Sequence, residues 1–187
     1  MKKFTLKKRI DLSWLDQITL ANRITLLRIL FIPLCLVFIL TTFYGLATVV
    51  FMALAFSDAI DGYIARKYNQ VSELGKQLDP LADKILVLTV LIGLTSKGLA
   101  DPMAVMIICA REFIIASIRT KKIFAASPIA KWKTGSQVLA IFMLLLNLPL
   151  AWLVLWAAVF LSLLSGWAYL WQSQILNQLW NNTVQNR

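Results

Sequence analysis

The stretch Asp58-Ala-Ile-Asp-Gly-Tyr-Ile-Ala-Arg66 is followed, after eight residues, by Gly75-Lys-Gln-Leu-Asp79-Pro-Leu-Ala-Asp83. These two segments, which lie between apolar runs at 46–56 and 85–94, contain four of the nine acidic residues of the chain, all of them aspartates. Carboxylates at the edge of a hydrocarbon layer are costly, and four together repel one another unless cations hold them. We therefore expect a metal site at a membrane surface.

The spacing of these aspartates predicts two neighbouring helices that share the site. Asp58 and Asp61 stand about one turn apart on a helix that continues the first apolar run. Asp79 and Asp83 share a face in the first turns of the next helix, which Pro80 is suited to start. Residues 67–78 are long enough to reverse the chain, so the two faces can meet. Four carboxylates suit a hard divalent cation, Mg²⁺ or Mn²⁺.

Two glycines and an arginine accompany the aspartates. Gly62 and Gly75 remove a side chain where the backbone must approach a bulky ligand or another helix. Arg66 lies one turn beyond Asp61 and offers planar hydrogen-bond donors to a diphosphate. The alternative is that the aspartates only cap or solvate helix ends, with Asp79 as an N-cap, but this leaves the whole pattern unexplained.

The pattern Asp-x2-Asp-Gly-x2-Ala-Arg-x8-Gly-x3-Asp-x3-Asp is matched at every fixed position. It resembles the signature of the CDP-alcohol phosphatidyltransferases, which are integral membrane enzymes that move a phosphatidyl group from a CDP-linked lipid to an alcohol. The resemblance implies that Asp58, Asp61, Asp79 and Asp83 bind metal and that Asp83 is also the proton acceptor. It also implies a homodimer.

Composition places the chain among membrane proteins. Of its 187 residues 59% are hydrophobic, and the mean hydropathy is +0.73. A span needs about 20 apolar residues, so we expect an all-α integral membrane protein with six transmembrane helices. The expected spans are 24–43, 46–65, 80–99, 102–120, 134–147 and 150–169, with a turn at Asn147 and Pro149.

The basic residues orient this bundle. Of the 19 Lys and Arg residues, Lys97 alone lies near the turns after the first, third and fifth spans. The positive-inside rule therefore places both termini and the aspartates on the cytoplasmic side of the inner (cytoplasmic) membrane. The net charge of +10 is explained by anionic lipid headgroups, and we expect no nucleic-acid partner.

Three segments are expected along the chain. Residues 1–20 form a basic N-terminal segment with an interfacial helix, 21–172 form the six-helix domain, and 173–187 form a polar C-terminal tail. Cys35 and Cys109 fall inside spans and are expected to be small apolar core residues.

The first span carries polar residues at its cytoplasmic end. The string Asn22-x2-Thr25-x2-Arg28 resembles the nucleotide-binding segment of the family, whereas snorkelling to headgroups is an equal alternative for Arg23. With the motif, the resemblance implies a set of residues that bind the CDP-lipid, namely Asn22, Thr25, Gly62, Arg66, Ser72 and Gly75.

A second basic cluster follows the motif. Arg111 lies deep in an apolar run and is two turns from Arg119, so both can flank one cavity. With Lys131 and Lys133 they would bind the phosphate of an acceptor alcohol, whereas Glu112 is expected to pair with a nearby cation. These segments resemble the phosphatidylglycerophosphate synthase branch, in which the acceptor is sn-glycerol 3-phosphate.

The chain contains no histidine, so a carboxylate is the natural base for activating a hydroxyl, and we assign this role to Asp83. We expect phosphatidyl transfer from CDP-diacylglycerol to glycerol 3-phosphate, giving phosphatidylglycerophosphate and CMP, with two divalent ions per site. One alternative is a cardiolipin synthase that uses phosphatidylglycerol. Another, from a different class, is a cation transporter with intramembrane aspartates.

Overall fold

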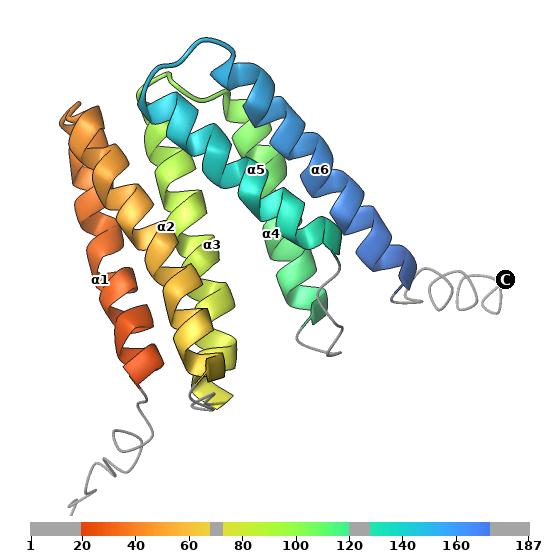
Figure 1. Cartoon of the computed structure of the whole chain (residues 1–187). Helices are drawn as coiled ribbons and strands as arrows, with labels where there is room; N and C mark the ends of the chain where they lie inside the picture. Colours follow the sequence, from red (N-terminus) through yellow and green to blue (C-terminus); the bar gives the residue numbers. More distant parts are fainter. Residues whose placement is uncertain (1–19, 68–72, 120–127, 173–187) are drawn as a thin grey trace, which may run out of the picture.

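The computed structural model describes residues 20–67, 73–119 and 128–172, with side chains placed for 25–57, 79–117 and 132–168. The described residues form six α-helices and no strand (Figure 1), which confirms the predicted all-α class. The helices are α1 (Leu20–Leu40), α2 (Tyr44–Lys67), α3 (Glu73–Ser96), α4 (Pro102–Arg119), α5 (Pro128–Leu145) and α6 (Ala151–Gln172). The expected interfacial helix before residue 20 and the tail 173–187 lie outside the described residues.

Successive helices run in opposite directions along the bundle (Figure 1). The turns after α1, α3 and α5 lie together at one end, which we call the turn end. At the other end α1, α3 and α5 begin and α2, α4 and α6 finish, and we call it the motif end because the Asp58–Asp83 segment lies there. The first turns of the odd-numbered helices and the last turns of the even-numbered helices therefore lie at the same end of the bundle.

The turn end is built from short connections that need unusual backbone angles. Gly98 has a φ of 70° between α3 and α4, and Asn147 has a φ of 49° between α5 and α6, so the predicted turn at Asn147 is confirmed. Asp101 caps α4 because its carboxylate accepts hydrogen bonds from the amides of Met103 at 2.7 Å and Ala104 at 3.2 Å.

Two helices begin six or seven residues earlier than the hydropathy pattern predicted, whereas the other four begin within four residues of their predicted starts. The third helix starts at Glu73 and not at Pro80, so Asp79 lies within α3 and is not its N-cap. Residues 73–78 are mostly strong helix formers, so α3 extends through Pro80 although this proline removes a backbone hydrogen bond and crowds the carbonyl of residue 76. The fifth helix starts at Pro128, which suits a first helical position, and not at Thr134.

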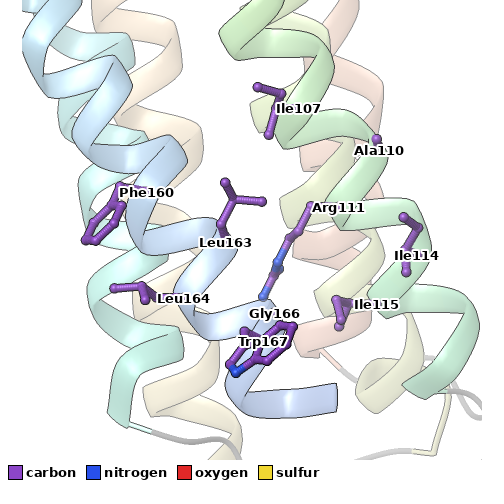
Figure 2. Close-up of a pocket in the computed structure, with 10 residues that line it drawn as sticks. All are labelled: Ile107, Ala110, Arg111, Ile114, Ile115, Phe160, Leu163, Leu164, Gly166 and Trp167. Carbon is purple, nitrogen blue, oxygen red and sulfur yellow. The ribbon is translucent and has the colours of Figure 1, made fainter. Parts of the chain in front are cut away.

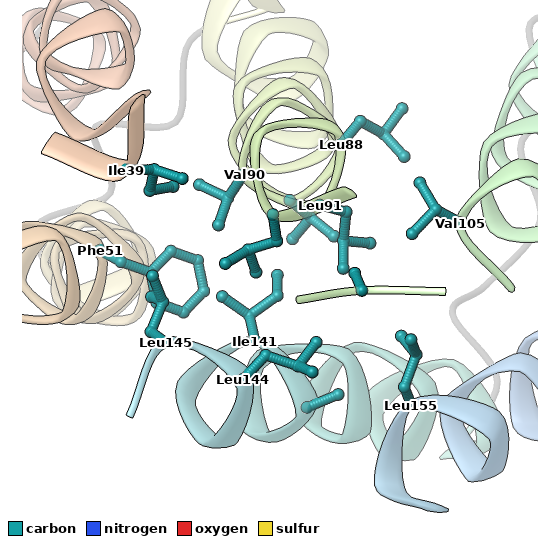
Figure 3. Close-up of a cluster of buried hydrophobic side chains, with 14 of the residues drawn as sticks. Ile39, Phe51, Leu88, Val90, Leu91, Val105, Ile141, Leu144, Leu145 and Leu155 are labelled. Carbon is teal, nitrogen blue, oxygen red and sulfur yellow. The ribbon is translucent and has the colours of Figure 1, made fainter. Parts of the chain in front are cut away.

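The centre of the bundle is a continuous apolar core to which all six helices contribute. Figure 3 shows side chains of several helices meeting around Val90 and Leu91 of α3, among them Phe51 of α2 and Ile141 of α5. Gly93 lets α3 approach α1 closely, because a methyl group there would lie 2.7 Å from Cδ1 of Leu36. This core fixes the helices that carry the site.

Polar and apolar side chains are distributed differently from those of a water-soluble bundle. Large apolar side chains face outward along the helices, including Leu30, Phe113 and Trp132, the last with 75% of its surface exposed. The buried set includes polar and charged residues, namely Thr25, Arg28, Thr48, Glu112, Lys133, Gln137, Ser162 and Ser165. Among the described helices, α6 has a window, Ala151–Ala168, that is long and apolar enough to cross a membrane, with a mean hydropathy of 1.8.

Candidate active site

The two halves of the acidic motif lie on different helices at the motif end. Asp58, Asp61, Gly62 and Arg66 belong to the last turns of α2, whereas Gly75, Asp79 and Asp83 belong to the first three turns of α3. The side chains of Asp58, Asp61 and Arg66 lie outside the described residues, as does the whole of Ser72. The fold therefore brings the two backbone segments to one end of the molecule, as the spacing predicted.

Helix α1 is bonded to α3 within the motif and to α2 directly before it. The hydroxyl of Thr25 donates a hydrogen bond to Oδ1 of Asp79 at 2.7 Å. Nε of Arg28 donates to the hydroxyl of Ser57, the residue before Asp58, at 3.3 Å. Thr25 is fully buried and Arg28 is 2% exposed, so neither side chain is directed to the surroundings of the bundle. The side chains of Asn22 and Arg23, one turn earlier, lie outside the described residues.

The described aspartates have the chemistry of a divalent-metal site. Asp79 and Asp83 are both partly exposed and lie at i, i+4 on one face of α3. Among the described side chains, no three carboxylate or thiol groups come together, and that set contains only two of the four motif aspartates. A hydroxyl that donates to one oxygen of a carboxylate fixes its direction, which is the usual outer-shell support for a metal ligand. The donor set therefore fits Mg²⁺ or Mn²⁺.

Glu112 joins two cations of the predicted acceptor site. Its Oε1 accepts a hydrogen bond from Nη1 of Arg111 at 2.8 Å and is also paired with Nζ of Lys133 on α5. Glu112 is 4% exposed and Lys133 8%, so this is a buried ionic cluster. The expectation that Glu112 pairs with a nearby cation is confirmed. Two cations share this one carboxylate, and together they have more N–H donors than it can accept, which favours an anionic ligand.

The remaining predicted cations are placed by their backbones. Arg119 is the last residue of α4, and Lys131 lies in the first turn of α5, both at the motif end (Figure 1). Their side chains are outside the described residues. All four predicted acceptor-site cations therefore belong to the same end of the bundle as the aspartates.

A pocket of about 540 Å³ lies between α4 and α6, and Arg111 extends into the space between these helices (Figure 2). Of its ten lining residues, the charged one is Arg111; the others are Ile107, Ala110, Ile114, Ile115, Phe160, Leu163, Leu164, Gly166 and Trp167. Nη2 of Arg111 donates a hydrogen bond to the hydroxyl of Ser165 on α6 at 2.7 Å. The sequence prediction found no motif in this last span and so missed Ser165 and Gly166. The sequence did contain a signal, because Ser165 and Gly166 interrupt a run of bulky apolar residues.

Comparisons with known proteins agree with this geometry. The sequence model of the CDP-alcohol phosphatidyltransferase family matches residues 18–164. The chain is 37% identical to a Bacillus subtilis (strain 168) protein named CDP-diacylglycerol--glycerol-3-phosphate 3-phosphatidyltransferase, and the match covers 80% of this chain and 92% of that protein. A Rickettsia bellii protein of the same name is 36% identical, with the same coverage. A Mycobacterium tuberculosis protein named probable phosphatidylglycerophosphate synthase is 35% identical over 80% of this chain and 79% of its own length.

Proposed function

Because the chain belongs to the CDP-alcohol phosphatidyltransferase family, we propose that it transfers the phosphatidyl group of CDP-diacylglycerol to sn-glycerol 3-phosphate. The products are phosphatidylglycerophosphate and CMP. One observation supports this assignment above the others: the acidic motif and a buried cationic cluster lie at the same end of one helical bundle. A donor diphosphate and an acceptor phosphate can thus be held beside each other.

The acidic residues carry the transfer step. Asp58, Asp61, Asp79 and Asp83 are the proposed ligands of two divalent cations, which when bound neutralise charge on the donor diphosphate. Asp83 accepts the proton of the acceptor hydroxyl, whose oxygen forms a bond to the lipid-linked phosphorus. The bond from that phosphorus to the CMP oxygen breaks, and CMP leaves with the electron pair. No covalent enzyme intermediate is required.

The donor is held by the ends of the first three helices. The proposed CDP-lipid-binding residues are Asn22, Thr25, Gly62, Arg66, Ser72 and Gly75. Thr25 acts here through Asp79, because its hydroxyl already donates to that carboxylate. A glycine at positions 62 and 75 leaves the backbone accessible to the nucleotide.

The acceptor phosphate is held by the second half of the bundle. Arg111, Arg119, Lys131 and Lys133 are the proposed phosphate-binding cations. The buried cluster around Glu112 favours a phosphate-bearing acceptor, because its two cations share one carboxylate and have further N–H donors to offer. Phosphatidylglycerol, the acceptor of a cardiolipin synthase, also carries a phosphate, so an acceptor screen decides between the two.

We also propose that the six helices cross the membrane, with both termini and the site on the cytoplasmic side of the inner membrane. The outward-facing apolar side chains and the buried polar ones support this arrangement. Lys97 is the basic residue near the turn end, and the positive-inside rule assigns the opposite side to the cytoplasm. Residues 21–172 would form the catalytic domain between an interfacial segment and a polar tail, and the enzyme would act as a homodimer.

Release of CMP by the purified protein tests the function. In detergent micelles with CDP-diacylglycerol, CMP should appear only when glycerol 3-phosphate and Mg²⁺ or Mn²⁺ are both present, and chelation of the metal should stop it. Equal release with phosphatidylglycerol as the sole acceptor would favour a cardiolipin synthase. Cation flux in proteoliposomes without CMP release would favour a transporter.

A further inference from the structure

Helix α6 places two small residues against the side chain of Arg111. Ser165 is buried, and its hydroxyl accepts a hydrogen bond from Nη2 of Arg111 at 2.7 Å. Gly166 is also buried, and a methyl group on it would lie 3.2 Å from Nε and 3.5 Å from Cγ of Arg111. Figure 2 shows the arginine extending from α4 toward the turn of α6 that carries Gly166. The arginine therefore has a hydrogen-bond partner on α6, and a side chain at position 166 would push it aside by a few tenths of an ångström.

The guanidinium of Arg111 is held in two directions. Nη1 donates to Glu112 on α4, and Nη2 donates to Ser165 on α6. Nε has no hydrogen-bond partner within the part of the chain that the structure describes, and it faces Gly166. A guanidinium is planar, so two fixed amino groups determine the direction of every N–H that it presents. Its direction is thus set by α6 as well as by α4.

We infer that Ser165 and Gly166 are positioning residues of the acceptor site and that they aim Arg111 at the acceptor phosphate. Ser165 holds one amino group, and Gly166 leaves space for the arginine stem beside α6. This inference rests on the proposed function, in which Arg111 binds that phosphate. It makes α6 a part of the acceptor site.

Ser165→Ala tests the hydrogen bond, and Ser162→Ala is its matched control. The two serines are buried one turn apart on α6, but Oγ of Ser162 has no hydrogen-bond partner among the described residues. Ser165→Ala should raise the KM for glycerol 3-phosphate about tenfold, because a hydrogen bond to a charged group is lost. The KM for CDP-diacylglycerol should not change. Ser162→Ala should leave both values near those of the parent enzyme.

Gly166→Ala tests the space beside α6. The added methyl group should displace Arg111 and also raise the KM for glycerol 3-phosphate several-fold. Gly45→Ala is the control, because a methyl group there would meet no atom within 4 Å. Inorganic phosphate serves as an independent probe: its inhibition constant against glycerol 3-phosphate should rise in both Ser165→Ala and Gly166→Ala. A general loss of folding would instead lower the thermal midpoint and the apparent kcat and leave both KM values unchanged.

Arg111→Ala separates the inference from the function on which it rests. If Arg111→Ala raises the acceptor KM but Ser165→Ala and Gly166→Ala behave like their controls, α6 does not position the arginine and the inference is wrong. If Arg111→Ala leaves the acceptor KM unchanged, the assignment of Arg111 to the acceptor phosphate fails first. In an Arg111→Lys background, Ser165→Ala should add little, because the amino group that it holds is gone.

Discussion

The hydroxyl of Thr25 connects α1 to the acidic motif of α3. It donates to Oδ1 of Asp79 at 2.7 Å from a fully buried position. A hydrogen bond to a charged group in such a place contributes about 1.5–3 kcal/mol. More important for catalysis, it restricts the rotation of the carboxylate, which leaves the other oxygen in a fixed direction.

Replacement of Thr25 separates orientation from packing. Thr25→Val keeps the shape but removes the donor, so it should raise the metal concentration needed for half-maximal activity by about tenfold, as expected for lost outer-shell support. The stabilisation of the protein by Mn²⁺ in thermal unfolding should weaken in parallel. Thr25→Ser keeps the hydroxyl and should restore both properties. An unchanged metal response in Thr25→Val would contradict this role for Thr25.

Asp83→Asn removes the proposed proton acceptor and one metal ligand while it keeps the size of the side chain. Turnover should fall by at least about 10²-fold, because a positioned general base contributes factors of that order. Binding of CMP, measured by calorimetry, should persist if Asn22 and its neighbours hold the nucleotide. Near-normal turnover in Asp83→Asn would mean that another group takes the proton.

At the scale of the elements, hydropathy predicted six helices and approximately where their apolar parts lie. It placed the starts of α3 and α5 too late, because the polar first turns of both helices carry no apolar signal. Those turns include Gly75, Asp79, Lys131 and Lys133, so these residues of the proposed active site lie on helices α3 and α5 and not on the loops before them. Helical backbone there is favoured by local propensity and by the position of Pro128 as a first residue.

The close contact of α3 with α1 gives a prediction about packing. Gly93 faces Leu36 and Ile39 of α1, and a methyl group on it would lie 2.7 Å from the first and 3.5 Å from the second. Gly93→Leu should therefore force the helices apart and lower stability by about 1–3 kcal/mol, as other overpacked cores do. Thermal unfolding in detergent should show a lower midpoint than for Gly45→Leu, whose position is open. Equal midpoints would show that α1 and α3 are not packed this closely.

At the scale of the molecule, the sequence was sufficient to predict that the motif aspartates and the acceptor-site cations lie toward the same end of the helical bundle. Alternating helices of similar length place every second connection on the same side, and the motif and the cations lie near those connections. The partners of each cation could not be predicted in this way. Arg111 and Ser165 are 54 residues apart, and Lys133 and Glu112 are 21 apart, so their contacts depend on how whole helices rotate about their axes. Hydrophobic periodicity alone does not fix that rotation.

Because successive helices alternate in direction, the fold also predicts from which side of the membrane a given residue is accessible. In a protein with Cys35→Ala and Cys109→Ala, a single cysteine can be introduced in place of Lys97 at the turn end or of Trp132 near the start of α5. Trp132 is 75% exposed and stands between Lys131 and Lys133, which suits the membrane–water interface, so a cysteine there is accessible to an aqueous reagent on that side. The net basic charge near the motif end should keep that end in the cytoplasm.

A membrane-impermeant maleimide added to spheroplasts should therefore label Lys97→Cys directly. It should label Trp132→Cys only after the membrane is permeabilised, because the proposed topology places this residue on the cytoplasmic side with the acidic motif. Labelling of both variants in intact spheroplasts would mean that the helices do not separate the two ends of the bundle by a bilayer. The reverse pattern would place the site on the outer face, where a nucleotide-linked donor made in the cytoplasm could not reach it. The topology and the choice of donor therefore stand or fall together.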